Sequence, residues 1–141
     1  MTQHSVSVAA VVTDDAGQVL VIQRRDNGAW QIPGGVLEIS ESIPAGVRRE
    51  VEEETGLVVE PGRLTGVYKN VRLGVVALVF RARVVGGQAQ PTEESAAVEW
   101  WPADRVAAEM AEAFAVRVLD ALDSGDAAVR LHDGVRLLPE S

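Results

Sequence analysis

Residues 34–57 read GGVLEISESIPAGVRREVEEETGL, and this stretch decides how the rest of the chain is interpreted. Within it, Glu50, Glu53 and Glu54 stand at positions i, i+3 and i+4, so on a helix their carboxylates share one face. Three like charges within a turn and a half repel one another and weaken an isolated helix. A cation held between them would explain this arrangement, and oxygen-only ligands favour hard ions such as Mg²⁺ or Mn²⁺.

The same stretch contains signals for both ends of a helix. Ser42 can cap the N-terminus, and Pro44 falls in the first turn, where its missing N–H does no harm. Gly56 supplies the left-handed residue that commonly ends a helix. The preceding Pro33-Gly34-Gly35 predicts a turn whose glycines let the backbone approach a ligand or ion closely.

The spacing of these residues resembles the signature of the Nudix hydrolase family, MutT-like members included. That signature is G, five residues, E, seven residues, R-E, an aliphatic residue, any residue, E-E, any residue, G and an aliphatic residue. Seven fixed identities at a background of roughly 7% each make a chance match far below one in a million. One departure is Ser40, where many family members have glycine, and it affects the loop rather than the chemistry. The matching residues are Gly35, Glu41, Arg49, Glu50, Val51, Glu53, Glu54, Gly56 and Leu57.

The resemblance covers about Ser5 to Leu122 and implies a fold and an activity. The fold is α/β (α+β), an α/β/α sandwich with a mixed β-sheet between helices. The activity is hydrolysis of a diphosphate linked to another moiety, typically a nucleoside. Water attacks phosphorus, while Mg²⁺ or Mn²⁺ neutralises the phosphate oxygens.

The resemblance also implies roles for individual residues. Arg49 would hold a carboxylate such as Glu41 or Glu53 in place rather than touch the metal. Glu94 lies six residues before Trp100, where family members often carry a further ligand or a general base. The general base is left open among Glu50, Glu54 and Glu94. The candidate metal ligands are the Gly34 carbonyl, Glu50, Glu53, Glu54 and Glu94.

Basic and aromatic side chains outside the helix are candidates for substrate binding. Arginine suits bidentate recognition of phosphate, and aromatic rings can stack on a base. Ordinary surface charge and core packing are the alternative interpretations. The candidates are Arg24, Arg25, Tyr68 and Lys69.

Composition narrows the classes of protein and partner. The 141 residues suit one domain, and no apolar run approaches the roughly 20 residues of a membrane span. A net charge of −8 argues against a nucleic-acid polymer as partner, whereas a small phosphorylated substrate fits if metal ions supply positive charge. The absence of cysteine and of a signal-peptide pattern agrees with a cytoplasmic location. A homodimer is left open.

Periodicity and turn signals predict the remaining elements. Residues 5–13 and 19–23 are expected to form a hairpin of two strands. Pro61-Gly62 is expected to interrupt regular secondary structure. Further strands are expected over 64–69, 74–85 and 96–101. One helix is expected over 105–122, because its apolar residues recur at helical spacing. Residues 123–141 form a C-terminal extension, expected to contain a hairpin over 129–137 with a two-residue Asp-Gly turn.

Three rival functions each account for only part of the sequence pattern. A catalytically silent Nudix-fold binding or regulatory module is expected to have a degraded signature, and this signature is intact. An isoprenoid diphosphate isomerase on the same fold depends on a cysteine, which this chain lacks. An acidic structural protein explains the charge but not the spacing. The sequence after the signature, EPGRLTGVYKN at residues 60–70, matches no substrate-specific pattern clearly.

Overall fold

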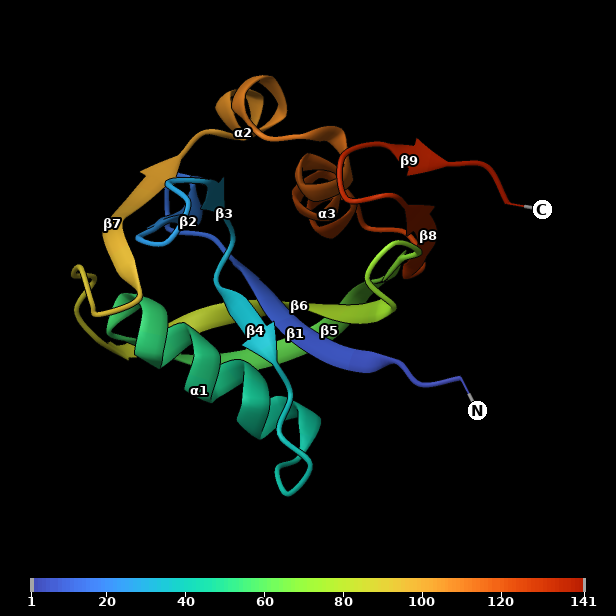
Figure 1. Cartoon of the computed structure of the whole chain (residues 1–141). Helices are drawn as coiled ribbons and strands as arrows, with labels where there is room; N and C mark the ends of the chain where they lie inside the picture. Colours follow the sequence, from blue (N-terminus) through green and yellow to red (C-terminus); the bar gives the residue numbers. More distant parts are fainter. Residues whose placement is uncertain (1, 141) are drawn as a thin grey trace.

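Six strands hydrogen-bond into one mixed sheet, which forms the centre of this computed structural model of residues 2–140 (Figure 1). Strands β1 and β6, and strands β5 and β8, pair in parallel, and the other neighbours are antiparallel. In spatial order the strands are β4 (Gly34–Val36), β1 (Ser5–Val12), β6 (Val75–Gly87), β5 (Leu57–Asn70), β8 (Ala128–His132) and β9 (Leu137–Leu138).

A smaller sheet and three helices complete the fold. The second sheet has the order β3 (Trp30–Gln31), β2 (Val19–Arg24) and β7 (Ser95–Trp101), with all pairs antiparallel. The helices are α1 (Ile43–Thr55), α2 (Ala103–Glu109) and α3 (Glu112–Leu122). Every helix within residues 2–140 is too short or too polar to cross a membrane.

Helices α1 and α3 cover opposite faces of the six-stranded sheet (Figure 1). Successive side chains of β1 point to opposite faces, as strand geometry requires. Val8 and Ala10 pack in one buried cluster with residues of α1, whereas Ala9 and Val11 pack in a second cluster with residues of α3. These two cores confirm the expected α/β/α sandwich with a mixed sheet.

Helix α1 has the ends that the sequence predicted. The Ser42 hydroxyl accepts a hydrogen bond from the backbone N–H of Ala45 at 3.2 Å, and proline lies in the first turn. Gly56 closes the helix with φ of 78°, a left-handed conformation that only glycine adopts without strain. Buried Val47 and Val51 attach one face of α1 to the sheet.

The expected hairpin of residues 5–13 and 19–23 is wrong. Strand β1 enters the six-stranded sheet between β4 and β6, and β2 enters the smaller sheet between β3 and β7. A single bridge between Thr13 and Val19 joins them. The buried parts of both strands, residues 8–12 and 19–22, are wholly apolar, so each strand can lie in the interior of a different sheet, and local pattern does not reveal the partner.

The expected interruption of secondary structure at Pro61-Gly62 is also wrong, because β5 continues from Leu57 to Asn70. Proline cannot donate a ladder hydrogen bond, so it is confined to edges and bulges. Strand β8 pairs with β5 only from Gly66 onward, which leaves the first half of β5 at an edge. The pairing of β5 with β6 shifts register between Pro61 and Leu64, so a bulge accommodates the proline.

The single helix expected over 105–122 is two helices, broken at Met110 and Ala111. Both residues adopt extended backbone angles, with ψ of 151° and 147°. The start of α3 is held by the C-terminal segment: Ala113 N–H donates to the Val135 carbonyl at 2.9 Å, and the Glu112 carboxylate accepts from Leu137 N–H at 2.7 Å. Partners this remote in sequence cap the helix, so local signals did not reveal its start.

The C-terminal segment contains a hairpin, but its connection is longer than expected. Strands β8 and β9 pair through Leu131 with Leu138 and His132 with Leu137, which leaves residues 133–136 as a four-residue loop instead of a two-residue turn. The Asp133 carboxylate closes this loop by accepting from the N–H groups of Val135 and Arg136. The hairpin extends the six-stranded sheet through the parallel pairing of β8 with β5.

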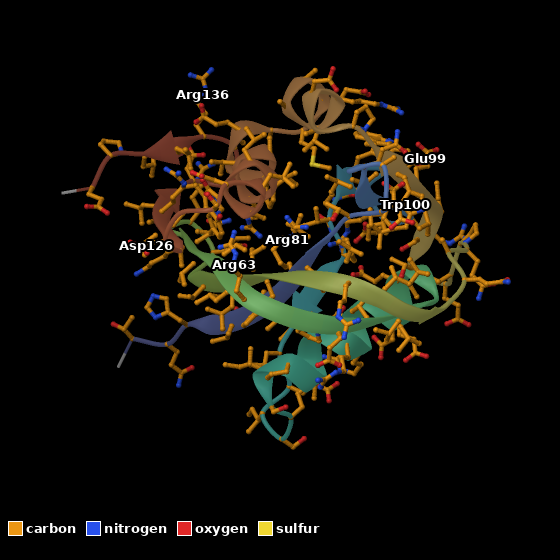
Figure 2. The ribbon with its side chains drawn as sticks, turned by 180° about the vertical axis from the view of Figure 1, so that it is seen from behind. Arg63, Arg81, Glu99, Trp100, Asp126 and Arg136 are labelled. Atoms are coloured by element: carbon orange, nitrogen blue, oxygen red, sulfur yellow. The ribbon has the colours of Figure 1, made fainter. Side chains whose placement is uncertain are left out.

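Two arginines from the sheet bind the end of α3 (Figure 2). Arg63 donates to the carbonyls of Ala121 and Asp123, and Arg81 donates to the Ala121 carbonyl and to the Thr13 hydroxyl. The last carbonyls of a helix have no partners within the helix, and positive charge is favourable there. These contacts fix the position of α3 over the sheet.

Candidate active site

Three carboxylates meet at one end of α1. Each of Glu50, Glu53 and Glu94 offers an oxygen within 4.8 Å of the other two. Glu50 and Glu53 are one turn apart on α1, and Glu94 comes from the loop that precedes β7. The cluster therefore joins two segments about forty residues apart. One is α1, which packs on the six-stranded sheet, and the other is the loop that leads into β7 of the smaller sheet.

The loop that carries Glu94 is fastened to the loop that follows β2. The Thr92 hydroxyl accepts from the N–H groups of Glu94 and Ser95, both at 3.2 Å. Arg25 donates through Nε to the Thr92 carbonyl at 2.9 Å, and its own N–H donates to the Glu94 carbonyl at 3.1 Å. Arg25 was predicted to bind substrate, and the structure shows its Nε holding the Glu94 loop.

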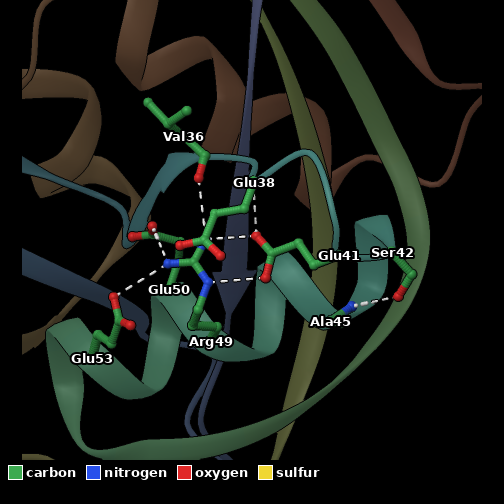
Figure 3. Close-up of polar contacts among 8 residues, drawn as sticks. All are labelled: Val36, Glu38, Glu41, Ser42, Ala45, Arg49, Glu50 and Glu53. Carbon is green, nitrogen blue, oxygen red and sulfur yellow. Dashed lines mark hydrogen bonds and ion pairs between the residues drawn. The ribbon is translucent and has the colours of Figure 1, made fainter.

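Arg49 lies between three carboxylates, as Figure 3 shows. It forms a bidentate pair with Glu41, through Nε to Oε2 at 2.9 Å and through Nη2 to Oε1 at 2.6 Å. Its Nη1 donates to Glu50 at 2.8 Å and to Glu53 at 3.3 Å. The Val36 carbonyl also accepts from Nη2. One guanidinium thus fixes the orientation of two members of the carboxylate cluster.

The glycine at position 35 makes room for the Glu50 carboxylate. A Cβ added at Gly35 would lie 2.5 Å from Oε2 and 2.7 Å from Oε1 of Glu50, which is closer than Cβ atoms approach other heavy atoms in proteins. Glu50 is only 8% exposed, and burial raises the pKa of its carboxyl, while the bond from Arg49 acts in the opposite direction. A bound cation would favour the charged form of this group.

Glu54, on the next turn of α1 after Glu50, is not part of the three-carboxylate cluster. It is 5% exposed, and its Oε1 accepts a hydrogen bond from the Gly34 N–H at 2.6 Å. Burial raises the pKa of this carboxyl to about 8; the Gly34 bond opposes the rise, and the nearby charges of Glu50 and Glu94 add to it. Glu41 shows the opposite behaviour, because hydrogen bonds from Arg49 lower its pKa to about 2.

A cavity of about 530 Å³ opens over these carboxylates. Its lining includes the carboxylates of Glu50, Glu54 and Glu94, the two glycines of the Gly34-Gly35 turn, and two arginines, Arg24 and Arg25. The Arg24 guanidinium forms a bidentate pair with Asp26, so its charge is already partly balanced. The cavity therefore combines acidic groups with few free positive charges, which is the balance expected where cations accompany a phosphorylated ligand.

Two predicted substrate contacts lie away from this cavity. Tyr68 is fully buried beneath α3, and its hydroxyl donates to Asp120 at 2.7 Å. Its ring cannot stack on a base, so that prediction is corrected in favour of core packing. Lys69, the next residue on β5, lines neither this cavity nor the neighbouring one. Sequence alone did not show that this part of β5 is covered by α3 and flanked by β8.

A second cavity of about 150 Å³ adjoins the first, and the two share Arg24, Gly34 and Gly35 in their linings. Gln31, Phe114 and Arg117 line the second cavity and were not singled out from the sequence. A signal for Arg117 existed: it interrupts the apolar face that buried residues form along α3 at helical spacing. A lone arginine within an apolar helix face is a candidate for a buried functional group.

The donor set of the carboxylate cluster fits a hard divalent cation. Its ligand atoms are all carboxylate oxygens, which suit Mg²⁺ and Mn²⁺ rather than zinc or copper. Glu50 and Glu53 are held by hydrogen bonds from Arg49, and the Glu94 loop is held by Arg25. Pre-oriented ligands of this kind are typical of metal sites, whose second-layer contacts strongly affect affinity.

Comparison with known proteins agrees with this geometry. Residues 3–122 match the family described as the NUDIX domain. A MutT-like protein of Streptomyces ambofaciens is 54% identical over 136 residues, covering 96% of this chain and 88% of the relative. An ADP-ribose pyrophosphatase of Methanocaldococcus jannaschii is 32% identical over 104 residues, covering 69% of this chain and 61% of the relative.

Solved structures show the same fold. A NUDIX hydrolase from Nitrosomonas europaea superposes with a TM-score of 0.76 at 24% identity, covering 93% of this chain and 79% of the other. A MutT NUDIX hydrolase from Burkholderia pseudomallei superposes with a TM-score of 0.72 at 26% identity, covering 84% and 98% respectively. In both comparisons the likeness covers most of this chain, so the fold is shared.

Proposed function

This chain belongs to the Nudix family and is a Nudix pyrophosphohydrolase, and from this premise we propose that it cleaves the phosphoanhydride bond of a nucleotide or nucleotide derivative with the help of Mg²⁺ or Mn²⁺. The observation that carries the proposal is the meeting of Glu50, Glu53 and Glu94 beside a cavity lined by two glycines. A cation held there would neutralise phosphate oxygens and lower the pKa of an attacking water.

The chain's own residues supply positioning and proton transfer. Glu50, Glu53 and Glu94 are the proposed ligands, with the Gly34 carbonyl as a further candidate, and Arg49 orients the first two. Glu54 is the proposed general base, because it lines the cavity beside the proposed ligands, and a bound cation would favour its charged, proton-accepting form. Glu50 and Glu94 remain alternative bases. Arg24 borders both cavities and is proposed to meet the phosphates between them.

A substrate panel tests the proposal. Nucleoside triphosphates, ADP-ribose and nucleotide sugars are incubated with the protein and Mg²⁺, and release of phosphate, pyrophosphate or nucleoside monophosphate is followed. We expect release from at least one substrate, its loss in excess chelator, and its recovery with Mg²⁺ or Mn²⁺. Turnover that persisted in chelator would exclude the metal-dependent mechanism. A folded protein that bound nucleotides without turning any over would instead support the silent binding module.

The remaining features of the proposal concern setting and assembly. We propose that the 141 residues act as one Nudix domain with residues 123–141 as its extension, in the cytoplasm and on small molecules rather than nucleic-acid polymers. The acidic balance of 21 Asp and Glu against 13 Lys and Arg supports the last point. A homodimer is left open, and light scattering of the purified protein would decide it.

A further inference from the structure

The second cavity is lined by Arg117, a half-buried arginine that has no acidic partner within residues 2–140. Arg117 projects from α3 toward the sheet, and its guanidinium lies against two aromatic rings, 5.1 Å from the Tyr68 centroid and 4.9 Å from the Phe114 centroid. Burial lowers the pKa of this group to about 10, which leaves it charged at neutral pH. Desolvation of a charge without an ion partner is unfavourable unless another group compensates.

The nearest acidic candidate on the same helix is already engaged. Asp120 accepts two hydrogen bonds from Arg130, both at 2.7 Å, and a third from the Tyr68 hydroxyl at 2.7 Å. Within residues 2–140 no carboxylate forms an ion pair with Arg117, although seven other arginine–carboxylate contacts and the Arg130 pair do form. The fold therefore places a cation here without neutralising it.

The hydrogen-bonding capacity of Arg117 is also largely unused. Its Nε is buried and has no partner in the part of the chain that the structure describes. Its Nη2 faces His132 Nε2 at 3.3 Å, while Nδ1 of the same ring faces the Gly134 N–H at 3.0 Å. Neutral imidazole has one acceptor nitrogen, so only one of these two contacts can be a hydrogen bond. The planar fork of Arg117 thus keeps donors that the described residues do not satisfy.

The surroundings of the fork indicate what it would bind. Phe114 and Gln31 also line the cavity that Arg117 lines, and this cavity shares Arg24 and Gly34 with the carboxylate cavity. Together the two cavities reach the roughly 300–1,000 Å³ typical of small-molecule sites. A nucleotide whose phosphates lie at the carboxylate end would place its base at the Arg117 end.

We infer that Arg117 is a specificity-determining residue that selects a 6-oxopurine base, such as guanine or hypoxanthine. The fork of an arginine matches the adjacent O6 and N7 acceptors of guanine, whereas adenine presents an amino donor at position 6 that would face the guanidinium donors. Phe114 offers a ring face for the base, and the Gln31 amide offers a further polar contact. This inference rests on the proposed function in one respect, namely that the ligand is a nucleotide.

Binding of nucleoside monophosphates tests the inference without turnover, since these probes contain no phosphoanhydride. IMP and AMP differ at position 6, where one carries an oxo group and the other an amino group. Titration calorimetry with Mg²⁺ should give wild-type protein a preference for IMP over AMP of about 5- to 150-fold in Kd, the discrimination of a good bidentate arginine–base pair. GMP should bind like IMP. Equal affinity for IMP and AMP, or no binding of either at millimolar concentration, would overturn the inference.

Two variants of Arg117 separate the fork from the charge. Arg117→Met should reduce the IMP/AMP ratio to near one, mainly by weakening IMP, and should leave the fold intact because it removes an unpaired buried charge. Arg117→Lys keeps a charge without the fork and should keep only part of the preference. The matched control is Arg136→Met, at an exposed loop position (labelled in Figure 2) that lines neither cavity, and it should leave the ratio unchanged.

The two proposals fail in different ways. A wild-type ratio retained by Arg117→Met would assign the preference to other groups and overturn the role of Arg117, whatever the hydrolytic activity. Turnover of the substrate panel without any base preference would likewise overturn this inference alone. A clear preference for IMP that depends on Arg117, found in a protein without turnover of any substrate, would support the base site and overturn the proposed hydrolysis.

Discussion

The guanidinium of Arg49 binds both oxygens of Glu41, at 2.9 and 2.6 Å, and the same group reaches the carboxylate cluster through its remaining nitrogen. Glu41 is thus an anchor that lies outside the cluster but fixes the residue that orients it. Bidentate arginine–carboxylate pairs combine strength with a fixed geometry. The position of Glu50 therefore depends on Glu41, which lies outside the carboxylate cluster.

Glu41→Gln should weaken divalent-ion binding by about 10- to 100-fold, the usual effect of removing a contact that supports a metal ligand. The amide keeps the size of the side chain but replaces one of the two acceptors with a donor, so Arg49 loses half of its anchor. Calorimetric titration with Mn²⁺ measures the effect. Glu60→Gln is the matched control, because it breaks the exposed Arg48–Glu60 pair nearby on the outside of α1. Equal effects of the two changes would mean that the anchor has no special role.

Glu53→Gln and Glu94→Gln should each reduce Mn²⁺ affinity at least about tenfold, and the double variant should lose less than the product of the two effects. Ligands of one ion act as a unit, so their contributions are not additive. Glu52→Gln should be nearly silent, because Glu52 is exposed on another face of α1. Additive losses from the double variant would place Glu53 and Glu94 at different sites.

The melting temperature reports the same site without any substrate. An ion at about 100 times its Kd stabilises the fold by roughly 2.7 kcal/mol, or several degrees for a domain of this size. Glu53→Gln should melt higher than wild type in chelator, since one repelling charge is gone, and should gain less from added metal. If wild type and Glu53→Gln gained equally, the ion would bind elsewhere.

The metal-free protein should lose stability as the pH rises from about 5 to 8, because of Glu54. The folded-state pKa of about 8 lies above the ordinary value of 4.5, so between these values the folded state holds a proton that the unfolded state has released. The stability contributed by this group is fully present below pH 4.5 and is lost as the pH rises through 8.

Comparison with Glu54→Gln isolates this contribution from the other titrating groups. The difference in melting temperature between the variant and wild type, measured in chelator, should grow by roughly 5–10 °C from pH 5 to pH 8. The glutamine can still accept the Gly34 hydrogen bond, so the local structure is kept. Glu52→Gln is the control and should show no such trend. A constant difference across this range would show that Glu54 is ionised throughout.

Arg25→Met should loosen the loop that presents Glu94 and thereby weaken Mn²⁺ binding several-fold. Arg25→Lys should restore part of the affinity, because an ammonium group can still donate to the Thr92 carbonyl. Hydrogen exchange of residues 92–95 provides a direct readout of the loop and should quicken in the methionine variant. Unchanged exchange together with a raised KM would instead assign Arg25 to phosphate binding.

Local chemistry explains why α1 could be predicted from the sequence. The hydroxyl of Ser42 and the positive φ of Gly56 act within a few residues of the helix that they bound, so their effect can be recognised from the sequence itself. The spacing of Glu50 and Glu53 likewise follows from helix geometry alone. The approach of Glu94 was predicted only through the family resemblance, because it depends on pairing between β2 and β7.

The features that were mispredicted depend on contacts between distant segments. The break at Met110 follows from a hydrogen bond between Ala113 and Val135, more than twenty residues away. The burial of Tyr68 follows from the position of α3 over β5, and the unpaired state of Arg117 follows from the capture of Asp120 by Arg130. Each outcome depends on which distant residues lie next to each other in the folded chain. The periodicity of the sequence contains no information on these long-range contacts.

The attachment of the Glu94 loop to the smaller sheet has a mechanical consequence. Glu50 and Glu53 belong to α1, which packs on the six-stranded sheet, whereas Glu94 belongs to the loop that leads into β7 of the smaller sheet. A cation bound by all three residues would tie the two sheets together, in the manner of a reversible cross-link. Opening of the β2–β7 edge would then be suppressed in the ion-bound protein, so the amides of β7 should exchange more slowly with metal than without it, far beyond the immediate surroundings of the ion.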